Sequence, residues 1–134
     1  MYLALRNITA KWTKPPHAWL GTPAEARFDL LALRTRTVVF AGTARDAALG
    51  FPKNANLAAA VALAGLGMDA TTVQLVADPA ASGNTGQIDA EGPAGRLQVS
   101  VSGASTAANP KTSGIVAYSV LACLANQAAA IALG

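Results

Sequence analysis

Alternating apolar and polar positions recur along the chain and predict short strands. Residues 8–14, 71–77, 87–91 and 97–102 alternate with a period of two, which is the pattern of a half-buried strand. The apolar stretch 37–41 predicts one more strand. Gly92, Pro93, Ala94 and Gly95 lie between the last two strands, so these strands are predicted to form a hairpin with a four-residue connection.

Helix signals separate the strands. Thr22 followed by Pro23 and Glu25 predicts a short capped helix within residues 17–36. We also expect a helical turn over 43–49, a helix over 52–66 that begins at Asn54 or the residue before it, and a last helix over 111–132. A glycine- and serine-containing loop precedes residue 87. The order predicts an α/β (α+β) domain over 1–134: a single mixed, largely antiparallel, open-faced sheet with helices on one side.

The second face of this predicted sheet is polar, and most of its side chains are small and uncharged. Its members are Gln74, Asp89, Glu91, Gln98, Ser100 and Ser102. Such a face is either exposed to solvent, as in many open antiparallel sheets, or is a sheet-to-sheet interface between two subunits. The pattern leaves both interpretations open.

Composition narrows the class of protein. The 134 residues are 52% hydrophobic and 13% charged, the opposite of the balance that disorder needs. Aromatic residues make up 5%, so the core must be packed with small side chains. Basic residues are concentrated in the first half, but they are scattered singly and belong to no nucleic-acid-binding motif. We therefore expect a solvated basic surface and no nucleic-acid partner.

Metal, disulfide and membrane functions find little support in the residues. Cys123 is the single cysteine and His17 the single histidine, so an internal disulfide is impossible and a metal site is not expected. Cys123 is interpreted as a core residue and His17 as a loop residue. No signal peptide is recognisable, and the uncharged stretch 112–134 is interpreted as a buried helix rather than a membrane span. We expect a cytoplasmic protein.

Polar groups at two predicted helix starts are the candidate binding residues. They are Asn54 and Asn56 at the first start, and Asn109, Lys111, Thr112 and Ser113 at the second. Helix N-termini attract carboxylates and phosphates, although Asn, Thr and Ser more often serve as ordinary caps. The sequence contains no Gly-x-Gly-x-x-Gly, so no nucleotide site is predicted.

Five short segments, in order, resemble the C-terminal domain of the L-aspartate dehydrogenase family. They are Lys-Pro-Pro-His-Ala-Trp-Leu-Gly-Thr-Pro-Ala-Glu (14–25), Pro-Lys-Asn-Ala-Asn-Leu-Ala-Ala (52–59), Ala-Gly-Leu-Gly (64–67), Val-Ala-Asp-Pro (76–79) and Asn-Pro-Lys-Thr-Ser (109–113). In that family a Rossmann domain binds the nicotinamide cofactor, and the C-terminal domain supplies the substrate pocket and the dimer interface. This chain resembles the second part.

The resemblance implies oxidation of L-aspartate to iminoaspartate with NAD or NADP, neither of which this chain would bind alone. It assigns Asn54, Asn56 and Asn84 to the substrate, and Asn109, Lys111, Thr112 and Ser113 to the cofactor cleft. The family carries Asn-x-His-Glu-Ile after the Asp-Pro loop, and its histidine is taken as the acid/base. Gly86 stands at that position here, and a glycine cannot transfer a proton.

Three functions compete on this sequence. The chain is a catalytic half that works with a Rossmann-domain partner, a degenerate domain that binds a small carboxylate without turnover, or a homodimerisation module that pairs through its sheet face. We expect a homodimer, and no catalysis by the chain alone.

Overall fold

A five-stranded sheet organises residues 5–103, the part of the chain that the computed structural model describes. The strands are β1 (Asn7–Lys14), β2 (Thr37–Thr43), β3 (Thr72–Ala77), β4 (Asn84–Gly92) and β5 (Gly95–Gly103), in the order β2-β3-β1-β4-β5. β1 runs parallel to β3, whereas β1 with β4 and β2 with β3 are antiparallel. The predicted mixed, largely antiparallel sheet is confirmed.

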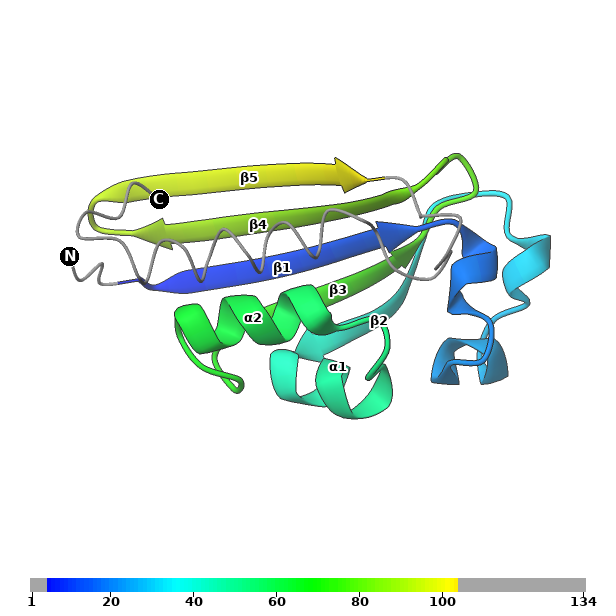
Figure 1. The fold of residues 1–134 in the computed structure, drawn as a ribbon, viewed down its shortest axis with the longest axis horizontal. Coiled ribbons are helices and arrows are strands. Elements are labelled where there is room, and N and C mark those ends of the chain that lie inside the picture. The colour runs from blue at the N-terminus through cyan, green and yellow to red at the C-terminus, as the bar shows by residue number, and fades with distance from the viewer. Residues whose placement is uncertain (1–4, 104–134) are drawn as a thin grey trace. The chain divides into compact units, whose positions relative to one another are not determined.

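Two helices, α1 (Ala44–Gly50) and α2 (Asn56–Ala64), lie on one face of the sheet (Figure 1). The Thr43 hydroxyl caps α1 by accepting a hydrogen bond from the Asp46 N–H at 3.1 Å. α2 ends where the Gly65 and Gly67 N–H groups both donate to the Ala62 carbonyl, at 3.3 and 2.8 Å. Gly67 has φ of +88°, a conformation that favours glycine.

Three 3-10 turns connect β1 to β2: η1 (Pro16–Trp19), η2 (Pro23–Ala26) and η3 (Leu30–Ala32). The predicted capping at Thr22 is confirmed, since its hydroxyl accepts from the Ala24 N–H at 3.3 Å. Glu25 reaches back to accept from the Gly21 N–H at 2.9 Å. The helix that follows is a single 3-10 turn. His17 is exposed on η1, as expected of a loop histidine.

The core lies between the sheet and the two helices, and alanine supplies much of it. Ala10, Val73 and Leu75 of the sheet belong to the same buried cluster as Ala47 of α1 and Ala58 and Ala62 of α2. Small side chains let the helices approach the sheet closely. Three aromatic side chains, Trp19, Phe40 and Phe51, supply the large residues of this core. The Phe51 ring centroid lies 6.1 Å from that of Trp19 and 5.3 Å from that of Phe40.

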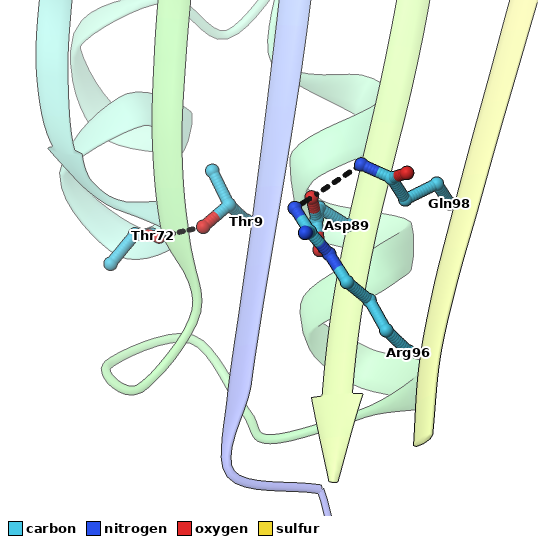
Figure 2. Close-up of polar contacts among 5 residues, drawn as sticks. All are labelled: Thr9, Thr72, Asp89, Arg96 and Gln98. Carbon is cyan, nitrogen blue, oxygen red and sulfur yellow. Dashed lines mark hydrogen bonds and ion pairs between the residues drawn. The ribbon is translucent and has the colours of Figure 1, made fainter.

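The opposite face of the sheet is polar, as predicted, and we call it the polar face. Neither α1 nor α2 covers it. The strand register adds Thr9 and Thr72 to the predicted members, and their hydroxyls are hydrogen-bonded at 2.8 Å (Figure 2). Asp89 accepts from Arg96 at 2.9 Å and from Gln98 at 3.0 Å, and these two bonds hold the pKa of Asp89 below its usual value.

Three predicted boundaries are wrong. The helix predicted over 52–66 begins at Asn56 and ends at Ala64, because residues 52–55 form a turn in which the Asn54 and Ala55 N–H groups donate to the Phe51 carbonyl. β4 begins at Asn84, in what was predicted to be a loop, since Thr85 and Gly86 pair with β1. The hairpin connection between β4 and β5 has two residues rather than four. The predicted helix over 111–132, with Cys123, lies outside the described residues.

Candidate functional site

The carboxyl ends of the two parallel strands bring the candidate site together. β1 ends at Lys14 and β3 at Ala77, which are partners in the register. β4 begins beside them, and the turn before α2 lies on the helix-covered side. Ile8, Ala10 and the residues that follow at intervals of two share that side, which places Lys14 on it.

Lys14 is buried at the end of β1, with 3% of its surface exposed. Its Nζ donates to Asn54 Oδ1 at 2.8 Å and lies 5.4 Å from the Trp12 ring centroid and 5.6 Å from that of Trp19. We call these four residues the Lys14 cluster. Among the described residues no carboxylate pairs with Lys14. Burial lowers the pKa of Lys14 from 10.5 to about 8, because removing the ammonium group from water disfavours its charge.

Trp19 holds one wall of the Lys14 cluster in place. Its indole is fully buried, its Nε1 donates to the Val76 carbonyl at 3.0 Å, and it meets the Phe51 ring edge-on. The prolines at positions 15 and 16 end β1 and begin η1, which turns the chain back over the ends of the strands. The Lys-Pro-Pro-His-Ala-Trp segment therefore folds as a unit around the ammonium group.

Asn84 and Gly86 lie on β4, next to the end of β1. Asn84 is buried with 4% of its surface exposed, and the register pair Thr13–Thr85 places it beside Lys14. Gly86 pairs with Trp12 across the two strands. A Cβ atom at Gly86 would lie 2.8 Å from Trp12 Cε3 and 2.7 Å from Leu57 Cδ2, so the indole and the leucine occupy the space that any side chain there would need.

The predicted site residues separate into three groups. The structure places Asn54 and Asn84 at the same end of β1. Asn54 is half-buried and bonds to Lys14 instead of capping α2, whose first flanking residue, Ala55, contributes no side-chain cap. Asn56 is exposed at the start of α2. The remaining predicted residues, Asn109, Lys111, Thr112 and Ser113, lie outside the described residues.

Lys14 is the residue that sequence reasoning missed as a site residue. The signal was available in the alternation of β1, since Ile8, Ala10, Trp12 and Lys14 follow one another at intervals of two. A lysine in line with apolar positions, directly before two prolines, indicates a buried ammonium group. Its hydrogen-bond partner could not be assigned from the sequence, because the contact with Asn54 spans 40 residues.

The described residues form one wall of a site rather than a closed pocket. A narrow gap beside Trp12, Asn54 and Leu57 is too small to hold a water molecule. No group of three or more His, Cys, Asp or Glu side chains in residues 5–103 could hold a metal ion. No helix in that same range is long and apolar enough to cross a membrane.

The architecture and the cluster define a class: an α+β domain whose buried lysine and carboxamides gather where parallel strands end. Comparison with known proteins identifies that class, since residues 2–127 match the family model "Aspartate dehydrogenase, C-terminal". The chain belongs to this family.

Named relatives agree with the family assignment. The chain is 52% identical over 120 residues to L-aspartate dehydrogenase of Cupriavidus taiwanensis, which covers 90% of this chain and 45% of the relative. It is 46% identical over 129 residues to that of Pseudomonas aeruginosa, covering 96% and 48%. The crystal structure of aspartate dehydrogenase from Thermotoga maritima matches with a TM-score of 0.68 and 28% identity, over 97% of this chain and 47% of that one. The chain thus spans about half the length of the relatives it matches.

Proposed function

We propose that this chain is the substrate-binding part of an enzyme that oxidises L-aspartate. One observation carries the proposal: a chain of the aspartate dehydrogenase C-terminal family keeps a buried ammonium group and two carboxamides together at the end of β1. Lysine and asparagine side chains offer hydrogen-bond donors to carboxylate oxygens. A dicarboxylate such as L-aspartate is the ligand class that fits such a set of donors.

The proposed reaction converts L-aspartate to iminoaspartate while NAD or NADP is reduced. The described residues do not fit a nicotinamide dinucleotide. Gly65 and Gly67 follow α2 and precede β3, whereas the dinucleotide fingerprint links a strand to a following helix. A Rossmann-domain partner would therefore supply the cofactor, and the chain by itself is expected to show no dehydrogenase activity.

Gly86 favours a second candidate function, a domain that binds a carboxylate, or forms a homodimer, without turnover. The family's acid/base histidine is replaced by glycine, and Trp12 and Leu57 fill the space beside it. Loss of a positioned acid/base group costs about 10²–10⁴-fold in rate.

Homodimerisation through the polar face and a cytoplasmic location belong to the same proposal. Hydrogen-bonded polar side chains along β3, β1, β4 and β5, among them Thr9, Thr72 and Gln98, support a sheet-to-sheet interface.

The test is reduction of NAD or NADP by L-aspartate. Three proteins are compared: the chain alone, the chain fused after a Rossmann half from a relative, and the fusion carrying Gly86→His with Trp12→Ala, which removes the larger of the two side chains that fill the space beside Gly86. We expect no turnover by the chain alone and turnover by at least one fusion. Turnover by the double variant alone would favour the degenerate domain. Folded fusions that are all silent would overturn the dehydrogenase assignment.

A further inference from the structure

Lys14 carries a charge in a place where charge is expensive. A buried ammonium group is normally paired with a carboxylate, because desolvation otherwise outweighs its hydrogen bonds. Lys14 has 3% of its surface exposed, and among the described residues its hydrogen-bond partner is the neutral Asn54 carboxamide. The indoles of Trp12 and Trp19 stabilise a cation but do not neutralise it. Within residues 5–103, no anion accompanies the Lys14 ammonium group.

The charged residues near Lys14 in the described part of the chain do not neutralise its ammonium group. Lys11 and Lys53 are themselves cations: Lys11 lies on the opposite face of β1, and Lys53, next to Asn54, is exposed. Asp78, which follows β3, forms no ion pair with Lys14, and its Oδ1 accepts from the Ala80 N–H at 2.9 Å. Burial lowers the Lys14 pKa, and none of the ion pairs of the described residues involves Lys14.

The groups around Nζ are arranged as donors for an incoming anion. The Asn54 oxygen accepts from Lys14, and among the described residues the Asn54 amide N–H₂ and two hydrogens of Nζ remain as donors on neighbouring side chains. The two oxygens of a carboxylate can accept from both. Asn84, buried on the neighbouring strand, adds a further carboxamide at the same end of β1.

We infer that Lys14 binds a carboxylate group of the substrate, with Asn54 as the residue that positions its ammonium group. The inference rests on the proposed function for the identity of the dicarboxylate. The alternative role is structural: Lys14 would tie the turn before α2 to the end of β1 through Asn54.

Calorimetric titration of the folded chain with succinate at pH 7 separates the two roles. Succinate presents two carboxylates and has no group that titrates between neutral and alkaline pH. We expect Lys14→Met to weaken binding by about tenfold or more, the loss typical of one hydrogen bond to a charged group. Lys11→Met is the matched control, since it removes the same charge from the opposite face of the same strand. It should leave the Kd within about twofold, because Lys11 is half-buried on the face of β1 that points away from the Lys14 cluster.

A second readout is the pH dependence of the succinate Kd. Binding by the wild-type chain should weaken as the pH rises from 7 to 10, because the ammonium group loses its proton. Binding by Lys14→Met should not change over this range. A folded Lys14→Met chain that binds succinate as tightly as wild type would overturn the inference, and so would a wild-type chain that binds neither succinate nor L-aspartate.

The Rossmann fusion distinguishes failure of this inference from failure of the proposed function. Aspartate oxidation with an unchanged KM in the Lys14→Met fusion would overturn the role of Lys14 and leave the dehydrogenase assignment standing. If succinate binding depends on Lys14 but the folded fusions oxidise no aspartate, the dehydrogenase assignment is overturned and the role of Lys14 stands.

Discussion

At the scale of single residues, the cost of burying Lys14 predicts how stability depends on pH. Its pKa is 10.5 in an ordinary setting and about 8 in the fold, so between these values the unfolded chain binds more protons than the folded one. The free energy of unfolding therefore rises with pH across this window. The burial penalty is fully present below pH 8 and is relieved above 10.5.

We expect Lys14→Met to be more stable than wild type by about 1–3 kcal/mol at pH 7, because it removes the buried charge and keeps an apolar stem. The difference should shrink as the pH rises towards 10. Urea unfolding at pH 7 and pH 10 measures it. A methionine variant less stable than wild type at pH 7 would mean that the bond to Asn54 stabilises the fold more than the charge destabilises it.

Gly86 predicts a second residue-scale effect. Alanine at this position should destabilise the chain by about 1–3 kcal/mol, since its Cβ would overlap the Trp12 ring and Leu57. Gly50→Ala is the matched control, because a Cβ there meets no atom within 4 Å. Denaturant unfolding of both variants compares them. Equal stabilities would show that Trp12 moves aside freely, and Trp12→Ala should restore much of what Gly86→Ala loses.

These residues also show the limit of reading a site from sequence. The resemblance pointed to Asn54, Asn84 and Gly86, and the first two lie with Lys14 at the end of β1. It did not indicate that Trp12 fills the space beside Gly86, because that contact depends on the register between β1 and β4. A register is a long-range property that local patterns leave undetermined.

At the scale of elements, the cap of α1 is testable. The helix has seven residues and depends on its ends, and the Thr43 hydroxyl satisfies the Asp46 N–H. Thr43→Ala should cost about 1 kcal/mol, whereas Thr43→Ser keeps the hydroxyl and should cost less. Thermal or urea unfolding distinguishes them. Equal losses in the two variants would assign the effect to the β-branched methyl group in β2 rather than to the cap.

Alternation located four of the five strands and an apolar stretch located β2, but neither signal could find where β4 begins. Asn84, Thr85 and Gly86 have the composition of a loop, and pairing with β1 makes them a strand. α2 also begins later than predicted because of contacts that the local pattern does not show. Residues 52–55 form a turn that is hydrogen-bonded to the Phe51 carbonyl, and the Asn54 side chain accepts from Lys14 instead of capping the helix.

At the scale of the whole molecule, periodicity and element order sufficed for the class of fold, because the strands other than β2 have one apolar and one polar side. The parallel pairing of β1 with β3 was not predicted, and it is this pairing that aligns Lys14 with the end of β3. The two faces of the sheet differ. One is packed by alanine-rich helices, and the other carries hydrogen-bonded polar side chains (Figure 2).

The polar face predicts that the proposed homodimer is sensitive to charge at its centre. β1 is the middle strand, and Thr9 lies on its polar side, hydrogen-bonded to Thr72. In a two-fold dimer each substitution occurs twice, so Thr9→Arg would add two large, like-charged side chains to a face that already carries Lys11. We expect sedimentation equilibrium to show a dimer for wild type and a monomer for Thr9→Arg. Leu63→Arg is the control, because Leu63 is 79% exposed on α2, on the other side of the sheet, and the dimer should persist. A monomeric wild-type chain, or a dimer that tolerates Thr9→Arg, would exclude the polar face as the subunit interface.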